Sequence, residues 1–282
     1  MTKPMTIPND ADFASSPLPF SGGCFKGQLV LVSGGGSGIG KATAWCFARL
    51  GAHVIITGRT EQKLIDTVAA LTSAGLSASY KIQDIRDYDG IAAMYADIFA
   101  EFGRLDILIN NAGGQFPQSA IDFSKNGWDA VVSNNLNGSW YMMQHAARQW
   151  RDRKQQGSIV NIVAVVPRGM NGGAHTCAAR AGVIHLSKTV AVEWAEYNIR
   201  VNCVAPGVIF SEGMRAYSPE ALSEFDKSNP MKRFGTPWDI AQACVYLGGP
   251  SGSFITGEVL TLDGGGQLWC DLWMQGRPDY FR

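Results

Sequence analysis

The chain has 282 residues, of which 46% are hydrophobic and 17% charged, so it is long enough to bury a full core as one α/β domain. Lys plus Arg and Asp plus Glu both number 24, a balance that gives no reason to expect nucleic acid or an acidic membrane surface as a partner. No run is apolar and long enough to span a bilayer, so we expect no membrane contact.

Residues 1–24 are predicted to form an N-terminal arm, because Pro, Ser, Asp and Thr are frequent there and the basic start and apolar centre of a signal peptide are missing. The six cysteines are scattered without C-x-x-C spacing. No cluster of His, Cys, Asp and Glu has the spacing of metal ligands. We therefore expect a reduced, cytoplasmic protein without a metal site.

The first unit of the domain is predicted to be a strand, a tight loop and a helix. Apolar residues at 30–33 precede a glycine-rich turn, and an alanine-rich segment follows at 43–50. Glycine lets the backbone approach a bulky anion, and a helix N-terminus offers unpaired N–H groups. The spacing Gly34-x-x-x-Gly38-x-Gly40 therefore predicts a phosphate cradle, although a plain tight connection would look similar. No G-K-[ST] follows, which disfavours a P-loop hydrolase.

The second strand, predicted at 53–57, is followed by Arg59. This residue stands about twenty positions after the last glycine of the turn, where dinucleotide-binding units place the residue that reads the adenosine ribose. A guanidinium pairs with a 2′-phosphate, whereas a carboxylate would accept bonds from a free 2′-hydroxyl. Arg59 therefore favours NADPH over NADH, and the alternative is a solvated Arg that opens the next helix.

Strand and helix patterns alternate through the rest of the chain. Helices are predicted at 62–74, 90–102, 128–151, 176–196 and 238–247, and strands at 78–83, 105–110, 158–163, 200–204 and 258–263. Apolar strands that alternate with helices predict a parallel sheet with helices on both faces, in one α/β domain over residues 25–266. Residues 210–234 are less periodic and are expected to form a mobile cover over a substrate.

Several short motifs stand in order along this domain. They are Ser33-Gly-Gly-Gly-Ser-Gly-Ile-Gly40, Asp84, Asn110-Asn-Ala-Gly113, Asn135-Leu-Asn-Gly138, Gly157-Ser-Ile-Val-Asn-Ile162, Arg200-Val-Asn-Cys-Val-Ala-Pro-Gly207 and Phe254-Ile-Thr-Gly257 with Asp263-Gly-Gly265. At this spacing the chain resembles the short-chain dehydrogenase/reductase family over roughly residues 26–266. The resemblance implies a single-domain, Rossmann-type, doubly wound parallel sheet. It also implies hydride transfer to or from NAD(P), and a homodimer or homotetramer built on the two long helices.

The resemblance also assigns residues to the cofactor. It implies Gly34, Ser37, Gly38, Ile39 and Gly40 for the pyrophosphate, Arg59 for the 2′-phosphate, Asp84 and Ile85 for the adenine, Asn111, Ala112 and Gly113 for the ribose, and Pro206, Gly207, Val208, Ile209 and Ser211 for the nicotinamide end. For the turn at 110–113, ordinary strand-ending chemistry is the alternative.

The chain departs from the family at the catalytic positions. The family's active site has a Ser on the fifth strand and a Tyr-x-x-x-Lys on the next helix, and this sequence contains no Tyr-x-x-x-Lys. The matching positions hold Arg180 for the Lys, Thr176 for the Tyr, and Ala164 or Val163 for the Ser. A threonine hydroxyl is a far weaker acid than a phenol, and arginine does not relay protons. Arg180 can instead donate hydrogen bonds to the cofactor ribose or to a developing negative oxygen, and Thr176 to a carbonyl oxygen.

An activated alkene suits such a site. Hydride addition to the β-carbon of a 2-enoyl thioester places charge on the thioester oxygen, and the α-carbon can be protonated afterwards, even by water. The Arg at position 180 and the Asn-Asn-Ala-Gly-Gly-Gln-Phe turn at 110–116 resemble the trans-2-enoyl-CoA and 2,4-dienoyl-CoA reductases, and also bacterial dehydrogenases of citronellol-like alcohols. The leading hypothesis is NADPH-dependent reduction of an acyl thioester, with an alcohol or carbonyl dehydrogenase of a terpenoid-like substrate and a catalytically silent NADPH-binding protein as alternatives.

Other polar residues are weighed against packing roles. Asn135 matches the family's bend-forming Asn, which implies that its backbone carbonyl holds a water in a proton path, and it is predicted to be catalytic beside Thr176 and Arg180. His175 could titrate near neutral pH, but a structural histidine is the simpler interpretation. His185 and Tyr141 are expected to pack. The aromatic tail at 267–282 could close a substrate pocket or an oligomer interface.

Overall fold

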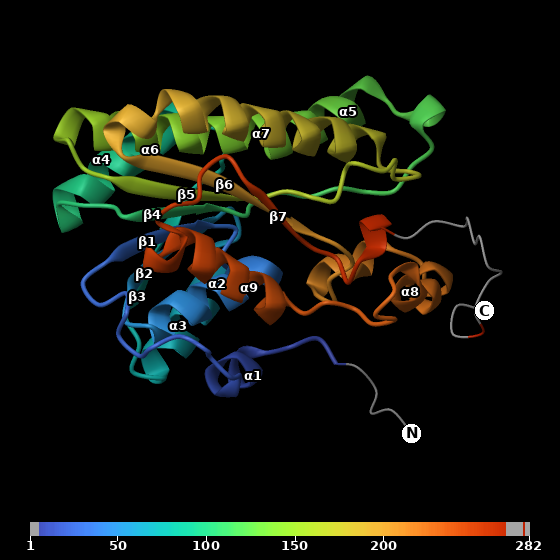
Figure 1. Cartoon of the computed structure of the whole chain (residues 1–282), viewed down its shortest axis with the longest axis horizontal. Helices are drawn as coiled ribbons and strands as arrows, with labels where there is room; N and C mark the ends of the chain where they lie inside the picture. Colours follow the sequence, from blue (N-terminus) through green and yellow to red (C-terminus); the bar gives the residue numbers. More distant parts are fainter. Residues whose placement is uncertain (1–5, 269–278, 280–282) are drawn as a thin grey trace.

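The computed structural model describes residues 6–268 and residue 279, and its centre is a parallel sheet (Figure 1). The strands are β1 (Leu29–Ser33), β2 (His53–Gly58), β3 (Ala78–Ile82), β4 (Ile107–Asn110), β5 (Gly157–Ile162), β6 (Ile199–Pro206) and β7 (Val259–Leu262). They lie in the order β3-β2-β1-β4-β5-β6-β7, and each neighbouring pair is parallel. The order reverses between β1 and β4, and sheets of this kind bind ligands beyond the carboxyl ends of the strands at such a point.

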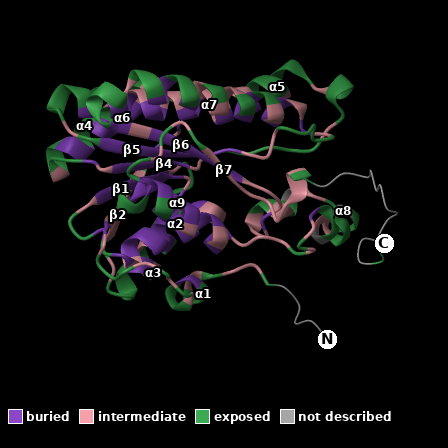
Figure 2. Cartoon of the chain, viewed as in Figure 1, coloured by how far each residue is buried: buried purple, intermediate pink, exposed green. Residues whose placement is uncertain are grey.

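Helices cover both faces of the sheet, which confirms the doubly wound, single-domain Rossmann-type fold predicted from the sequence. They are α2 (Gly38–Arg49), α3 (Glu61–Ser73), α4 (Tyr88–Phe102), α5 (Lys125–Val132), α6 (Gly138–Arg153), α7 (Ala174–Glu193), α8 (Pro219–Phe225) and α9 (Pro237–Gly248). Figure 1 shows α2, α3 and α9 below the sheet and α4, α6 and α7 above it, with α5 extending the upper layer. The strands β1, β4 and β5 are buried along their whole length, and Figure 2 shows them between helices whose outer faces are exposed. Burial on both faces explains why their sequences are apolar without alternation.

The described part of the predicted N-terminal arm packs against the domain. It contains a short helix, α1 (Asp10–Ser15), which the sequence analysis did not predict. Phe13 is only 2% exposed and stacks on Trp238 of α9 with 6.0 Å between the ring centroids. The Asp10 carboxylate pairs with Lys41 of α2 at 3.1 Å. The arm therefore bridges α2 and α9, two of the helices on one face of the sheet.

The helix predicted at 128–151 is two helices in the structure. A π-helical turn, Ser133–Asn137, separates α5 from α6, because one extra residue is inserted between two regular helical stretches. The segment predicted as a cover, 210–234, holds α8 between two short 3-10 helices, Glu212–Ala216 and Asp226–Ser228. Most of the aromatic tail, which was expected to close a pocket or an interface, lies outside the described residues, at 269–278 and 280–282.

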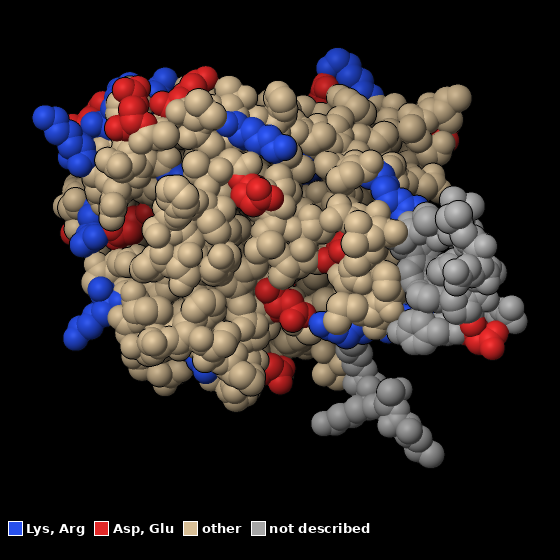
Figure 3. Space-filling model, in the orientation of Figure 1, with Lys and Arg blue, Asp and Glu red and all other residues tan. Residues whose placement is uncertain are grey.

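Charge is mixed at the surface. On the face drawn in Figure 3, Lys and Arg stand among Asp and Glu at the end of the molecule formed by α4 and α6. In the described part of the chain, no helix is long and apolar enough to cross a membrane, and no group of three His, Cys, Asp or Glu side chains could hold a metal ion. The described cysteines, Cys24, Cys46, Cys177, Cys203 and Cys244, are unpaired.

Candidate functional site

The turn between β1 and α2 contains two glycines in the left-handed backbone region. Gly34 and Gly38 have φ of 67° and 52°, a region that L side chains rarely adopt. Gly40 acts differently, because a Cβ there would lie 2.2 Å from the carbonyl oxygen of Gly34 and 2.4 Å from Nδ2 of Asn111. Gly40 therefore lets the helix pack against the ends of the strands, and it does not line the cleft described next.

A cleft of about 310 Å³ lies over the ends of β1, β2 and β4. The Ser33 hydroxyl accepts the backbone N–H groups of Asn111 and Ala112, each at 3.0 Å, and Asn111 Nδ2 donates to the Ser33 and Gly34 carbonyls. These bonds fix the end of β4 to the glycine turn. Most of the predicted cofactor residues line this cleft: Gly34, Ser37, Gly38, Ile39, Arg59, Asp84, Ile85, Asn111, Ala112, Gly113 and Ser211. Four further lining residues were not predicted as cofactor residues: Thr60, Lys63, Asn134 and Glu212.

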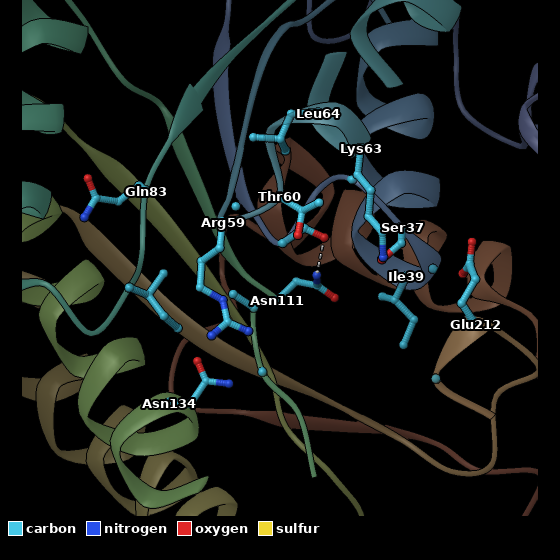
Figure 4. Close-up of a pocket in the computed structure, with 18 of the residues that line it drawn as sticks. Ser37, Ile39, Arg59, Thr60, Lys63, Leu64, Gln83, Asn111, Asn134 and Glu212 are labelled. Carbon is cyan, nitrogen blue, oxygen red and sulfur yellow. Dashed lines mark hydrogen bonds between the residues drawn. The ribbon is translucent and has the colours of Figure 1, made fainter. Parts of the chain in front are cut away.

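Two cationic residues, Arg59 and Lys63, line this cleft. Figure 4 shows the Lys63 side chain directed toward Ser37, while the Arg59 side chain extends toward Asn134. Lys63 was missed: it lies four positions after Arg59, in the first turn of α3, whereas Arg59 precedes that helix. The two side chains end in different parts of the cleft, and both give it positive charge.

Asp84 lines the same cleft and is held by a neighbour. Arg86 donates to both oxygens of the Asp84 carboxylate, at 3.0 and 3.1 Å from Nε. These hydrogen bonds, and the charges of Arg86 and Arg59, lower the pKa of Asp84. The carboxylate is therefore ionised and oriented where the sequence analysis expects the adenine.

A larger cavity, of about 820 Å³, adjoins the cleft at the carboxyl ends of β5 and β6. Ile39, Asn111, Gly113, Ser211, Glu212 and Gly213 line both spaces, so the two are continuous. Its wall includes the remaining predicted cofactor residues Pro206, Gly207, Val208 and Ile209, the apolar side chains Phe116, Val163, Val165, Met170, Met214 and Phe225, and Arg180. A ligand that spans both spaces would place one end beside apolar surface.

Arg180 is a buried cation at the wall of this cavity. Its Nη1 donates to the Ile162 carbonyl at 2.9 Å, and Nη2 lies so close to Gly113 that a Cβ there would be 2.1 Å away. Within the described residues, no carboxylate forms an ion pair with Arg180. Burial lowers the pKa of Arg180 to about 10, which leaves the guanidinium charged at neutral pH. The site therefore offers an uncompensated positive charge to a ligand.

Thr176 does not reach the cavity. It is 1% exposed and is not among the lining residues, although it lies one helical turn before Arg180 on α7. Its backbone N–H donates to Nδ1 of His175 at 2.8 Å. The His175 ring packs against Phe116 and Phe123, with centroids 4.8 and 4.3 Å away, and burial lowers its pKa. Helical spacing put Thr176 and Arg180 on one face, but only the longer side chain extends into the cavity.

Asn135 lies in the π-helical turn and holds the loop after β4. Its Oδ1 accepts the N–H of Gly114 at 3.0 Å, and its Nδ2 donates to the Gly114 carbonyl at 2.9 Å. Its backbone carbonyl, expected to hold a water, accepts the Ser139 hydroxyl at 2.9 Å. The side chain of Asn135 thus fixes the segment that lies against Arg180.

Comparisons with known proteins agree with this geometry. Residues 34–267 match the family model described as enoyl-(acyl carrier protein) reductase. A probable 2,4-dienoyl-CoA reductase of Bacillus subtilis is 41% identical over 84% of this chain and 96% of its own, and a peroxisomal 2,4-dienoyl-CoA reductase of Arabidopsis thaliana is 37% identical over 89% and 87%. A solved citronellol catabolism dehydrogenase (AtuB) of Pseudomonas aeruginosa is 38% identical, with a TM-score of 0.79 over 88% of this chain and 98% of its own. The chain belongs to the short-chain dehydrogenase/reductase family of NAD(P)-dependent oxidoreductases.

Proposed function

We propose that this protein uses NADPH to reduce the carbon–carbon double bond of a 2-enoyl thioester. The observation that carries the proposal is Arg180, a buried guanidinium that faces an apolar cavity with no carboxylate partner in the described chain. A buried charge is costly unless something compensates it. The negative enolate oxygen formed from the enoyl thioester would compensate the Arg180 charge during the reaction and not before it. An interaction that is stronger in the transition state than in the bound substrate lowers the barrier.

The residues at the cleft fit a dinucleotide phosphate. When bound, the reduced nicotinamide supplies a hydride. The first turn of α2, which begins at Gly38, offers backbone N–H groups that suit the pyrophosphate. The pair Arg59 and Lys63 suits a 2′-phosphate, and this supports NADPH over NADH.

The apolar cavity suits an acyl chain, and the relatives named as 2,4-dienoyl-CoA reductases act on that kind of thioester. Asn135 is proposed to hold the loop that lies beside Arg180. Thr176 is buried, and its proposed role is packing. Neither residue contacts a reacting atom in this proposal. Arg180 alone then retains the catalytic role assigned from the sequence.

A second candidate is oxidation of a terpenoid-like alcohol, which the likeness to the citronellol catabolism dehydrogenase favours. Alcohol oxidation needs a group that takes the hydroxyl proton, and neither Thr176 nor Arg180 is suited to that. A third is binding of NADPH without turnover. The unpaired charge of Arg180 argues against it, since a silent binder has no need of an anion at that point.

We also propose a homodimer or homotetramer formed through α6 and α7. Trp140 of α6 stacks on Trp194 at the end of α7 with 6.2 Å between centroids, and Val192 on α7 is 79% exposed. A reducing, cytoplasmic setting is in keeping with the unpaired cysteines of the described chain. Sedimentation of the wild type and of Val192→Glu would test the interface.

The function is tested by following NADPH consumption with a medium-chain trans-2-enoyl-CoA and, in parallel, NADP⁺ reduction with a terpenoid alcohol. We expect turnover of the thioester. A double variant, Thr176→Tyr with Arg180→Lys, restores the usual family pair and should reduce the enoyl-CoA more slowly than the wild type. Alcohol oxidation gained in that variant, with no enoyl reduction by the wild type, would contradict the proposal and favour a degenerate alcohol dehydrogenase.

A further inference from the structure

A hydrogen bond crosses the mouth of the larger cavity. Gln115 in the loop after β4 donates from Nε2 to the Tyr217 hydroxyl oxygen at 2.7 Å, and both residues line the cavity. Tyr217 belongs to the 210–234 segment and packs edge-on against Phe225, with 5.1 Å between the ring centroids. The bond therefore joins the wall of the cavity to the segment that covers it, and it places a phenol there.

The Tyr217 hydroxyl is available as a proton donor. Its oxygen accepts from Gln115, and the described residues supply no acceptor for its own proton. Because the side chain is only partly buried, water can reach it. An amide N–H that donates to the oxygen also stabilises the phenolate left after proton transfer.

The other polar groups of the cavity are poorer acids, are engaged, or lie where the cavity meets the cleft. Serine hydroxyls and side-chain amides are far weaker acids than a phenol, and Arg180 is held as a cation. Both oxygens of Asp263 accept backbone N–H groups, from Gly265 and Gln267. Glu212 lies beside the glycine turn: a Cβ added at Gly38 would be 3.5 Å from Oε2 of Glu212. Among the described lining residues, Tyr217 is the one phenol.

We propose that Tyr217 is the catalytic acid of this site and that Gln115 positions it, an inference that rests on the proposed enoyl reduction. Hydride addition at the β-carbon breaks the carbon–carbon π bond and leaves an enolate whose oxygen faces Arg180. The Tyr217 O–H bond then breaks, its proton forms the new bond at the α-carbon, and the carbonyl reforms. The resulting phenolate takes a proton from water, so the thioester gains one hydride and one proton and the phenol is restored.

The test is the stereochemistry of the reduction in D₂O. A fixed acid delivers deuterium to one face of the α-carbon, whereas water delivers it to both. We expect one labelled product from the wild type and a mixture of both from Tyr217→Phe, with kcat lowered by about 10²-fold. Gln115→Ala keeps the phenol but removes the bond that holds it, so it should scramble the label partly and lower kcat less. Tyr246→Phe, on an exposed tyrosine of α9, is the matched control and should behave as the wild type.

The outcomes separate this inference from the proposed function. A wild type that does not reduce the enoyl-CoA overturns both. Single-face labelling by a Tyr217→Phe enzyme that still turns over would overturn the inference alone, because another group would then deliver the proton. Equal effects of Tyr217→Phe and Gln115→Ala would also overturn it, since the hydroxyl would then serve only to close the cavity.

Discussion

Replacement of the two cations in the cofactor cleft should change the preference between NADPH and NADH. Arg59 and Lys63 both line the cleft and both are exposed. A hydrogen bond to a charged group contributes about 1.5 to 3 kcal/mol, and exposure to water argues for the lower end of that range. Each cation is therefore worth about 1.5 kcal/mol toward a 2′-phosphate, or roughly tenfold in the dissociation constant.

The assay is titration of Arg59→Ala, Lys63→Ala and the double variant with NADPH and NADH. We expect NADPH to bind about tenfold more weakly to each single variant and about a hundredfold more weakly to the double one, with NADH unchanged, and the difference to shrink as salt is added. Lys41→Ala is the control, because Lys41 pairs with Asp10 and does not line the cleft. Equal loss of both cofactors, or no loss, would refute the assignment of these cations to the 2′-phosphate.

Three further predictions concern stability. Phe13→Ala should lower the free energy of unfolding by about 3 kcal/mol in a denaturant titration, because a buried ring is removed from its stack. Phe254→Ala, at a fully exposed ring, is the control and should not lower it. Equal free energies of unfolding for the two variants would show that the arm does not stabilise the domain. Gly40→Ala should abolish cofactor binding or folding, since its Cβ would meet backbone at 2.2 Å, and a folded variant that binds NADPH normally would contradict the packing assigned there. Burial lowers the pKa of His175, so at a pH below the usual histidine pKa the unfolded chain binds more protons than the folded chain. The free energy of unfolding therefore falls as the pH drops through that usual pKa. In denaturant titrations at pH 5 and 7, His175→Asn should reduce this loss, and His185→Asn, at an exposed histidine, should not. An unchanged pH dependence in the former variant would refute that account.

The fold could be predicted because its strands are buried on both sides. In β1 and β4, apolar runs without alternation indicate a covered parallel strand, and the helices between them have clear periodicity. The helix α1 could not be predicted in the same way. It is short, and it is ordered by contacts such as Phe13 with Trp238, which lies far along the chain.

The site was predicted less completely, for reasons that differ between residues. Glycine spacing predicted the tight turn after β1, because positive φ at Gly34 and Gly38 restricts the residue type. Spacing on α7 could not show that Thr176 stops short of the cavity while Arg180 extends into it, since that depends on side-chain length. Tyr217 gave no sequence signal, because its partner Gln115 comes from another part of the chain.

The most direct test of the central claim is the effect of charge at position 180 on enoyl reduction. Arg180→Met removes the charge and keeps much of the volume, and Arg180→Lys keeps the charge. We predict that kcat/KM for a medium-chain trans-2-enoyl-CoA falls by about 10²-fold or more in Arg180→Met, and less in Arg180→Lys, while both variants still bind NADPH. Unchanged turnover in Arg180→Met would contradict a role for the buried guanidinium in stabilising the enolate.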